Sequence, residues 1–122
     1  MKITDLMIGN WVRDRRGGMP LRVNPFMAAH EVSEWEPMPL TTKMLTENGF
    51  WLESTKYKDR YRCNFDGSKT FAIVDFHQHV ILTESDNGME VCRIERRPDH
   101  TLAVHELQQA MYYVGIRQDF VL

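Results

Sequence analysis

Three groups of side chains in this sequence could do chemistry, and the first lies near the end of the chain. His105-Glu106-Leu107-Gln108-Gln109 begins like the helical zinc-protease signature. That chemistry needs two histidines four residues apart on a helix, so that both reach one metal ion, and position 109 is glutamine. We therefore interpret His105 as a solvent-facing or helix-start residue and not as a zinc ligand.

The second group is Asp75, His77 and His79. Alternate residues of a strand point to the same face, so these side chains would offer three metal ligands on one face if the strand is unbroken. The alternative is that residues 76–79 form the turn of a hairpin. Because the ligand set is incomplete, we predict that the protein holds no metal and needs no cofactor.

The third group is the cysteine pair, Cys63 and Cys92, which lie far apart in the sequence without CxxC spacing. Nucleophilic catalysis needs a positioned base and an orienting group, and the spacing supplies neither. We predict that both are free, half-buried strand thiols, because cysteine is among the most buried residue types. The sequence also has no GxSxG elbow, phosphate-binding loop or Rossmann glycine set, so we predict that the protein is not an enzyme.

The most specific feature is a run of alternating cations and other residues at positions 56–62. In an extended chain its cations would all point to one face, and these are Lys56, Lys58, Arg60 and Arg62. A nucleic-acid backbone would suit such a face, with a neighbouring tyrosine stacking on a base.

A second basic tip is predicted at Arg13, Arg15 and Arg16, in the first hairpin. The alternative interpretation of the basic strand is that its charges protect an exposed sheet edge from pairing with another chain. Both interpretations stay open at the level of the sequence.

The composition describes one globular domain, residues 1–122, with 43% hydrophobic and 26% charged residues. The formal net charge is −2, so no overall field draws the chain to nucleic acid or anionic lipid. The apolar runs are too short for a membrane span, and the first ten residues lack the apolar core of an export signal. We expect a cytoplasmic protein without membrane contact.

The elements that must position these residues divide into residues 1–40 and residues 41–122. In the first part, residues 10–14 and 19–24 are predicted to pair as a hairpin across Arg15-Arg16-Gly17-Gly18, whose two glycines can supply the positive φ of a turn. Pro20 has no backbone donor and is predicted at an edge. Residues 26–36 are compatible with a third strand or a short helical turn, and we favour the strand.

In the second part, residues 41–48 are predicted to form a short helix, with Thr41 as N-cap and Gly49 ending it. A second helix is predicted over residues 102–114, with Gly115 closing it. On that helix an apolar arc that includes Leu107 would be buried, with polar residues opposite. Between the helices, period-two alternation predicts an antiparallel meander at residues 50–55, 58–64, 70–76, 79–84 and 89–96.

These elements together predict an α+β fold. Four short segments also resemble a family of small uncharacterised proteins of gut-bacterial genomes, often found among prophage and mobile-element genes. The segments are IGNWV at residues 8–12, PMPLT at 37–41 with NGF at 48–50, and VHELQ at 104–108. The resemblance implies a cytoplasmic accessory protein whose N-terminal half is similar to a small SH3-like barrel, and it carries over no site residues.

The sequence leaves the function unknown, and two hypotheses follow. The first is a non-enzymatic interaction protein that binds another protein or a second copy of itself. The second is a nucleic-acid-binding accessory module that uses the basic strand and the Arg15-Arg16 tip. The net charge favours the first.

Overall fold

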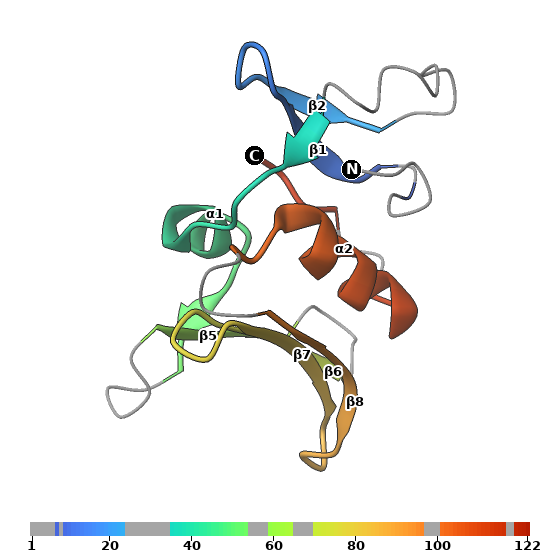
Figure 1. Ribbon diagram of the computed structural model, residues 1–122. Helices are drawn as coiled ribbons and strands as arrows, with labels where there is room; N and C mark the ends of the chain where they lie inside the picture. Colours follow the sequence, from blue (N-terminus) through green and yellow to red (C-terminus); the bar gives the residue numbers. More distant parts are fainter. Residues whose placement is uncertain are drawn as a thin grey trace.

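The structure is a computed structural model that describes residues 7, 9–23, 35–53, 59–64, 70–96, 101–116 and 119–122. A three-stranded sheet and a five-stranded sheet lie on opposite sides of a central helical layer (Figure 1). This combination of antiparallel sheets and helices confirms the predicted α+β class.

The five-stranded sheet is the predicted meander, in which each strand pairs antiparallel with the next along the chain. Its order is β4-β5-β6-β7-β8, so β4 and β8 are its edge strands. The strands are β4 (Trp51–Leu52), β5 (Arg60–Asn64), β6 (Thr70–Asp75), β7 (Val80–Ser85) and β8 (Glu90–Glu95).

The first helix, α1 (Thr42–Glu47), begins and ends as its local sequence predicts. The Thr41 hydroxyl accepts the Met44 N–H at 3.2 Å. Gly49 adopts φ +89°, and the Phe50 N–H donates to the Leu45 carbonyl at 2.9 Å. This is the hydrogen bond of a Schellman motif, which needs a left-handed residue at the glycine position.

The second helix, α2 (Val104–Tyr113), ends in the same way. Gly115 has φ +84°, and the Ile116 N–H donates to the Met111 carbonyl at 2.9 Å. At its start, Glu106 Oε1 accepts the Ala103 N–H at 3.0 Å. In the described part of the chain, neither helix is long and apolar enough to cross a membrane.

The three-stranded sheet has the order β2-β1-β3, with β1 (Trp11–Asp14), β2 (Pro20–Arg22) and β3 (Trp35–Pro37). The predicted hairpin is confirmed, and Pro20 lies on an edge strand as expected. Of the two glycines, only Gly18 adopts positive φ, at +69°, so the prediction that both do is wrong. Its N–H donates to the Asp14 carbonyl at 2.7 Å and closes the turn.

The first three strands form an open sheet in the described residues, and these residues do not close into a barrel. Residues 35–37 are extended, which agrees with the favoured third strand at that end. The rest of the doubtful segment, residues 26–34, lies outside the described residues.

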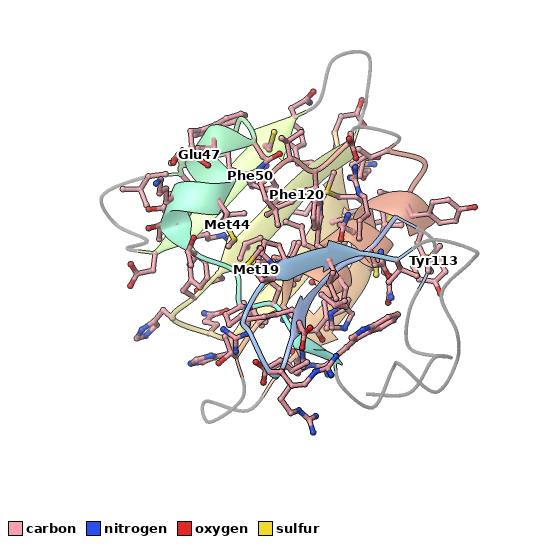
Figure 2. All side chains as sticks on the ribbon, turned by 90° about the horizontal axis from the view of Figure 1, so that it is seen from above. Met19, Met44, Glu47, Phe50, Tyr113 and Phe120 are labelled. Carbon is pink, nitrogen blue, oxygen red and sulfur yellow. The ribbon has the colours of Figure 1, made fainter. Side chains whose placement is uncertain are left out.

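The main core lies between α2 and the five-stranded sheet, and α2 contacts β6, β7 and β8. Leu107 is fully buried there, as the predicted apolar arc requires. Phe50 and Phe120 join the same core and lie near the middle of the molecule, whereas Tyr113 lies towards the rim (Figure 2).

Part of the polar side of α2 is covered by the N-terminal sheet, which corrects the prediction of a single buried face. The Gln108 side chain accepts the Trp11 N–H at 2.8 Å and donates to the Gly9 carbonyl at 3.0 Å. Gln109 donates to Asn10 Oδ1 at 3.0 Å. The N-terminal sheet is therefore fixed to α2 by amide side chains, because these satisfy backbone groups that would otherwise lose water on burial.

The last residues of the chain join the N-terminal sheet to α1, and Arg22 of β2 donates to the Phe120 carbonyl at 3.2 Å. The Trp11 indole N–H donates to the Phe120 carbonyl at 2.8 Å, and Arg22 stacks on the Trp11 ring at 4.7 Å. The Asn48 side chain forms two hydrogen bonds with the backbone of Val121, at 2.7 and 2.8 Å. The tail thus links β1 and β2 to the end of α1.

Candidate interaction site

The basic residues of β5 lie on the face of the five-stranded sheet that is turned away from α2. Residues opposite each other in neighbouring strands share a face, and the register places Arg62 opposite Ile73. Ile73, Val80 and Leu82 form a small buried cluster on this face. The side chains of Arg60 and Arg62 are only 19% and 21% exposed, so they do not project freely into solvent.

Three carboxylates surround the two arginines. Glu53 bridges both, with Oε2 at 2.8 Å from Arg60 Nε and Oε1 at 2.8 Å from Arg62 Nη2. Arg62 Nη2 also lies 3.1 Å from Glu84 Oε1, and Arg60 Nη1 lies 3.8 Å from Asp75 Oδ2. These ion pairs match the charges of the two arginines within the sheet, so little positive potential is left for a phosphate backbone.

The other two cations of the predicted basic face, Lys56 and Lys58, lie outside the described residues. The edge-protection interpretation is wrong for Arg60 and Arg62, because β5 is an inner strand with β4 on its outer side. In the described structure they pair with carboxylates of β6, of β7 and of the residue that follows β4.

The second predicted basic tip lies in the turn between β1 and β2. Arg15 is exposed, and the Arg16 side chain is 74% exposed beside Asp14, at 3.6 Å. Arg13 instead forms an ion pair with Glu36 of β3, at 2.7 Å. The hairpin therefore presents Arg15 and Arg16 to solvent, and Arg13 stabilises the sheet.

Asp75, His77 and His79 do not share a strand face. Asp75 ends β6, and its Oδ1 accepts the N–H groups of His77 and Gln78, each at 2.9 Å. His79 has φ +56° in the following turn. The hairpin alternative is thus the observed one, and within the described residues no group of three or more His, Cys, Asp or Glu could hold a metal ion.

Cys63 is buried against the core and Cys92 is half-buried, and both are free thiols, as predicted. Burial raises the pKa of the Cys63 thiol to about 11. The thiolate is the nucleophilic form of cysteine, so Cys63 is poorly reactive near neutral pH.

His105 lies at the start of α2, as one of its two interpretations has it, but it is buried and not solvent-facing. The next residue, Glu106, is also buried and forms an ion pair with Arg96, which follows β8. Because α2 lies between two sheets, polar residues on its first turn are covered from both sides.

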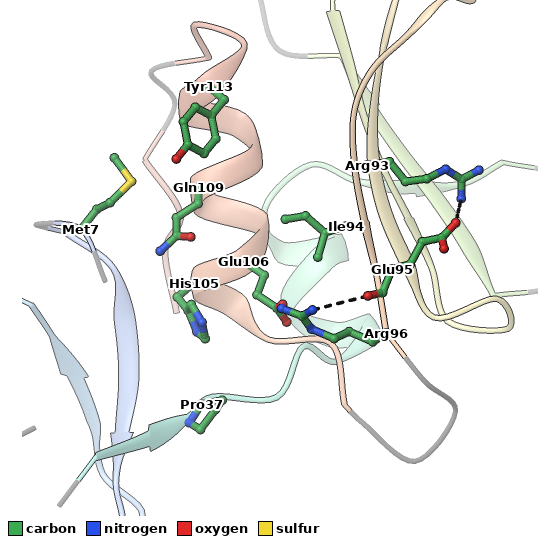
Figure 3. Close-up of a pocket in the computed structure, with 10 residues that line it drawn as sticks. All are labelled: Met7, Pro37, Arg93, Ile94, Glu95, Arg96, His105, Glu106, Gln109 and Tyr113. Atoms are coloured by element: carbon green, nitrogen blue, oxygen red, sulfur yellow. Dashed lines mark hydrogen bonds and ion pairs between the residues drawn. The ribbon is translucent and has the colours of Figure 1, made fainter. Parts of the chain in front are cut away.

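A pocket of about 830 Å³ opens where α2 approaches the end of β8 (Figure 3). One wall is Arg93, Ile94, Glu95 and Arg96, which are consecutive in the chain. The other wall comes from α2, where Glu106, Gln109 and Tyr113 contribute. Ile94 points towards α2, whereas Arg93 and Glu95 lie on the opposite face of the strand. We call this region the β8 groove.

Along β8, the side to which each residue points its N–H and C=O groups is fixed by the pairing with β7. The Arg96 N–H donates to the His79 carbonyl at 2.8 Å, on the side of β7. Hydrogen-bonded and non-hydrogen-bonded pairs alternate along an antiparallel ladder, so Ile94 also bonds towards β7, and the N–H and C=O groups of Arg93 and Glu95 point outwards. In the described sheet β8 is the last strand, so no further described strand pairs with these outward groups. The Glu95 carbonyl instead accepts a long hydrogen bond, at 3.4 Å, from Nη1 of the Arg96 side chain.

No family model, curated protein or solved structure matches this chain.

The sequence pattern does not single out the β8 wall of the groove, and the residues of its α2 wall stand out only through the partial zinc-protease motif that begins at His105. One signal was present: β8 is the last strand of the meander, and Arg93 and Glu95 flank an apolar residue. The approach of α2 and the Arg96–Glu106 ion pair join parts of the chain that no local pattern connects.

Proposed function

We propose that this protein is a non-enzymatic interaction protein that binds a protein partner at the β8 groove. The observation that carries the proposal is an edge strand whose outward peptide groups lie beside a groove walled by a helix. Unpaired N–H and C=O groups of an edge strand are a template for pairing with another chain. A strand added between an edge strand and a neighbouring element is a recurring mode of protein recognition.

Exposed apolar side chains support a protein partner. Tyr113 is 74% exposed at the end of α2, and Val91 of β8 is 58% exposed. Aromatic residues are enriched in protein interfaces, because they bury a large area with few rotatable bonds.

The candidate chemical groups support a role other than catalysis. Burial raises the pKa of the Cys63 thiol, Asp75 stabilises a turn through its backbone contacts, and Glu106 is engaged by Arg96 and the start of α2. The family resemblance adds a setting to the proposal: a cytoplasmic accessory protein of a prophage or mobile element, with residues 1–40 related to an SH3-like barrel.

Site-specific photo-crosslinking tests the proposal. A photoreactive amino acid replaces Tyr113 in one variant and Met19, an exposed residue of the first hairpin, in the control variant. After irradiation in the producing cells, we expect a discrete protein adduct at position 113 that is absent at position 19. The adduct is identified by mass spectrometry and then reconstituted from the purified partner.

An equal adduct pattern at the two positions would contradict the proposal, as would a partner that fails to bind when purified. A crosslink from one chain of this protein to another copy would identify the copy as the partner.

Nucleic-acid binding is the second candidate, and the exposure of Arg15 and Arg16 favours it. The two other candidate cations, Lys56 and Lys58, lie outside the described residues. Each phosphate neutralised contributes about 0.7–0.9 to the slope of log affinity against log salt, so four contacts would give a slope near −3.

Titration of labelled single- and double-stranded oligonucleotides at low and moderate salt separates the two functions. We expect no submicromolar binding, because the described arginines of β5 are paired with carboxylates. Tight, salt-sensitive binding that weakens in the Arg15→Ala, Arg16→Ala variant would establish the second function instead.

A further inference from the structure

We propose that the partner at the β8 groove is a second copy of this chain, paired antiparallel through β8 so that the two five-stranded sheets join edge to edge. This inference rests on the proposed function and names its partner. It follows from the phase of the peptide groups and from the charges next to them.

The direction of these peptide groups limits the registers in which two copies of β8 can pair. Only residues whose N–H and C=O groups point outwards can form hydrogen-bonded pairs across the new boundary, and around the groove these are Arg93 and Glu95. A symmetric antiparallel pair centred within residues 93–95 therefore has three registers. Arg93 lies opposite Arg93 of the other copy, Glu95 lies opposite Glu95, or Arg93 lies opposite Glu95.

The charges select the third register. Like charges directly opposite each other destabilise an antiparallel pair, and opposite charges stabilise it. When Arg93 lies opposite Glu95 of the other copy, two such pairs form about the symmetry axis. Ile94 then faces its own copy at the axis, in a non-hydrogen-bonded pair, where side chains approach most closely.

Charged residues on an edge usually oppose pairing with another chain. In β8 the same two charges disfavour the two registers that place like charges opposite each other. They favour the third register, because two antiparallel copies of Arg93-Ile94-Glu95 then place each arginine opposite a glutamate. Within one chain Arg93 contacts Glu90 at 3.0 Å and Glu95 at 2.9 Å. These carboxylates are 44% and 65% exposed. Because exposed ion pairs contribute little to stability, replacing these pairs by ion pairs between the two copies costs little free energy.

The contact is short, since it centres on a few residues of one strand from each chain. Interfaces smaller than about 1,200 Å² are typical of weak and transient complexes. We therefore expect a dimer with a Kd in the micromolar range and not an obligate assembly.

Charge reversal tests the register directly by sedimentation equilibrium. The Arg93→Glu variant and the Glu95→Arg variant should each be monomeric, since each places like charges opposite each other, with Kd raised about tenfold or more. Mixed in equal amounts, the two variants should form a heterodimer, because every cross-strand charge pair is then opposite in sign. Circular dichroism checks that each variant is folded.

Three results would overturn the proposal: a parent protein that is monomeric at high concentration, single variants that dimerise as well as the parent, or a mixture that stays monomeric.

Cysteine crosslinking gives an independent test that does not depend on charge. In a Cys92→Ser background, Ile94→Cys should form an intermolecular disulfide rapidly under mild oxidation, because the opposed Cα atoms lie within disulfide range. Arg93→Cys and Glu95→Cys report the other two registers and should crosslink more slowly. Fastest crosslinking at position 93 or 95 would contradict the register.

The inference and the proposed function can fail separately. If the parent is monomeric while position 113 still crosslinks a different protein, the second copy is the wrong partner and the interaction function stands. If neither a dimer nor an adduct at position 113 forms, both are wrong.

Discussion

Glu53 holds the two arginines of β5 together, and this single residue tests the ion-pair description of the sheet. Glu53→Ala should lower the free energy of unfolding by about 1–3 kcal/mol, since two partly buried guanidinium groups lose their shared acceptor. Glu47→Ala is the matched control, because Glu47 is exposed and lies 3.9 Å from Lys43. Urea denaturation measures both, and equal midpoints would show that the ion pairs contribute nothing to stability.

Substitution of Leu107 tests which face of α2 is buried. Leu107→Ala should cost roughly 2–5 kcal/mol, the range for deleting a buried leucine and leaving a cavity. Tyr113→Ala, on the same helix at a mostly exposed position, should change stability far less. A thermal midpoint for Leu107→Ala no lower than that of Tyr113→Ala would mean that the buried face of α2 is assigned wrongly.

Cys63 gives a prediction for pH. Burial raises the pKa of the Cys63 thiol from its ordinary value of 9.0 to about 11 in the folded protein. Between these values the unfolded chain loses the thiol proton and the folded chain keeps it, so stability falls as pH rises through this window. Urea midpoints between pH 8 and about pH 11 should therefore decline more steeply in the parent than in Cys63→Ala. Parallel declines would contradict the shift.

At the scale of single residues, the sequence predicted which side chains are buried better than it predicted which side chains they pair with. Cys63 and Leu107 are buried as expected, because apolar periodicity reports burial directly. The cations of β5 were placed on one strand face, but alternation within a strand is silent about neighbouring strands. Glu53 and Glu84, which neutralise Arg62, come from segments before and after β5 and could not be foreseen.

Helix termination is the sharpest test at the scale of elements. Gly115→Ala should cost about 1–2 kcal/mol, because an alanine at φ +84° adopts the left-handed conformation that L-residues avoid. No atom lies within 4 Å of the added Cβ, so the cost arises from the backbone alone. Gly17→Ala, where φ is not positive, is the control and should be nearly neutral by thermal unfolding. Equal effects would show that the Schellman motif of α2 does not depend on glycine.

Elements whose signals are local were predicted well. Both helices end at a glycine, and α1 also begins at a capping threonine, Thr41. The strands of the meander follow from alternation between turns. The surroundings of the polar side of α2 were predicted wrongly, because the sequence does not show whether a glutamine binds water or, as Gln108 does, the backbone of Trp11. Amphipathicity separates polar from apolar faces, but it does not say that the polar face is solvated.

At the scale of the whole molecule, α2 and the C-terminal tail are shared by the two sheets (Figure 1). The contacts that create this arrangement join Trp11 to Gln108 and to Phe120, nearly the full length of the chain apart. Such pairings depend on tertiary packing, so composition and periodicity could predict the α+β class but not how the two sheets meet. The β8 groove belongs to this scale, because it exists only where α2 approaches the edge of the sheet.

The central claim is that β8 is an open edge that another protein strand can occupy. Residue-resolved hydrogen exchange tests it most directly, since amide protection reports which N–H groups are bonded. In dilute protein the amides of Arg93 and Glu95 should exchange fast and the amide of Ile94 slowly. Raising the concentration from about 10 µM to about 500 µM, which brackets a micromolar Kd, should slow Arg93 and Glu95 alone. The account would be contradicted if the Arg93 and Glu95 amides were as protected as the Ile94 amide in dilute protein. It would also be contradicted if their protection changed neither with concentration nor with added partner.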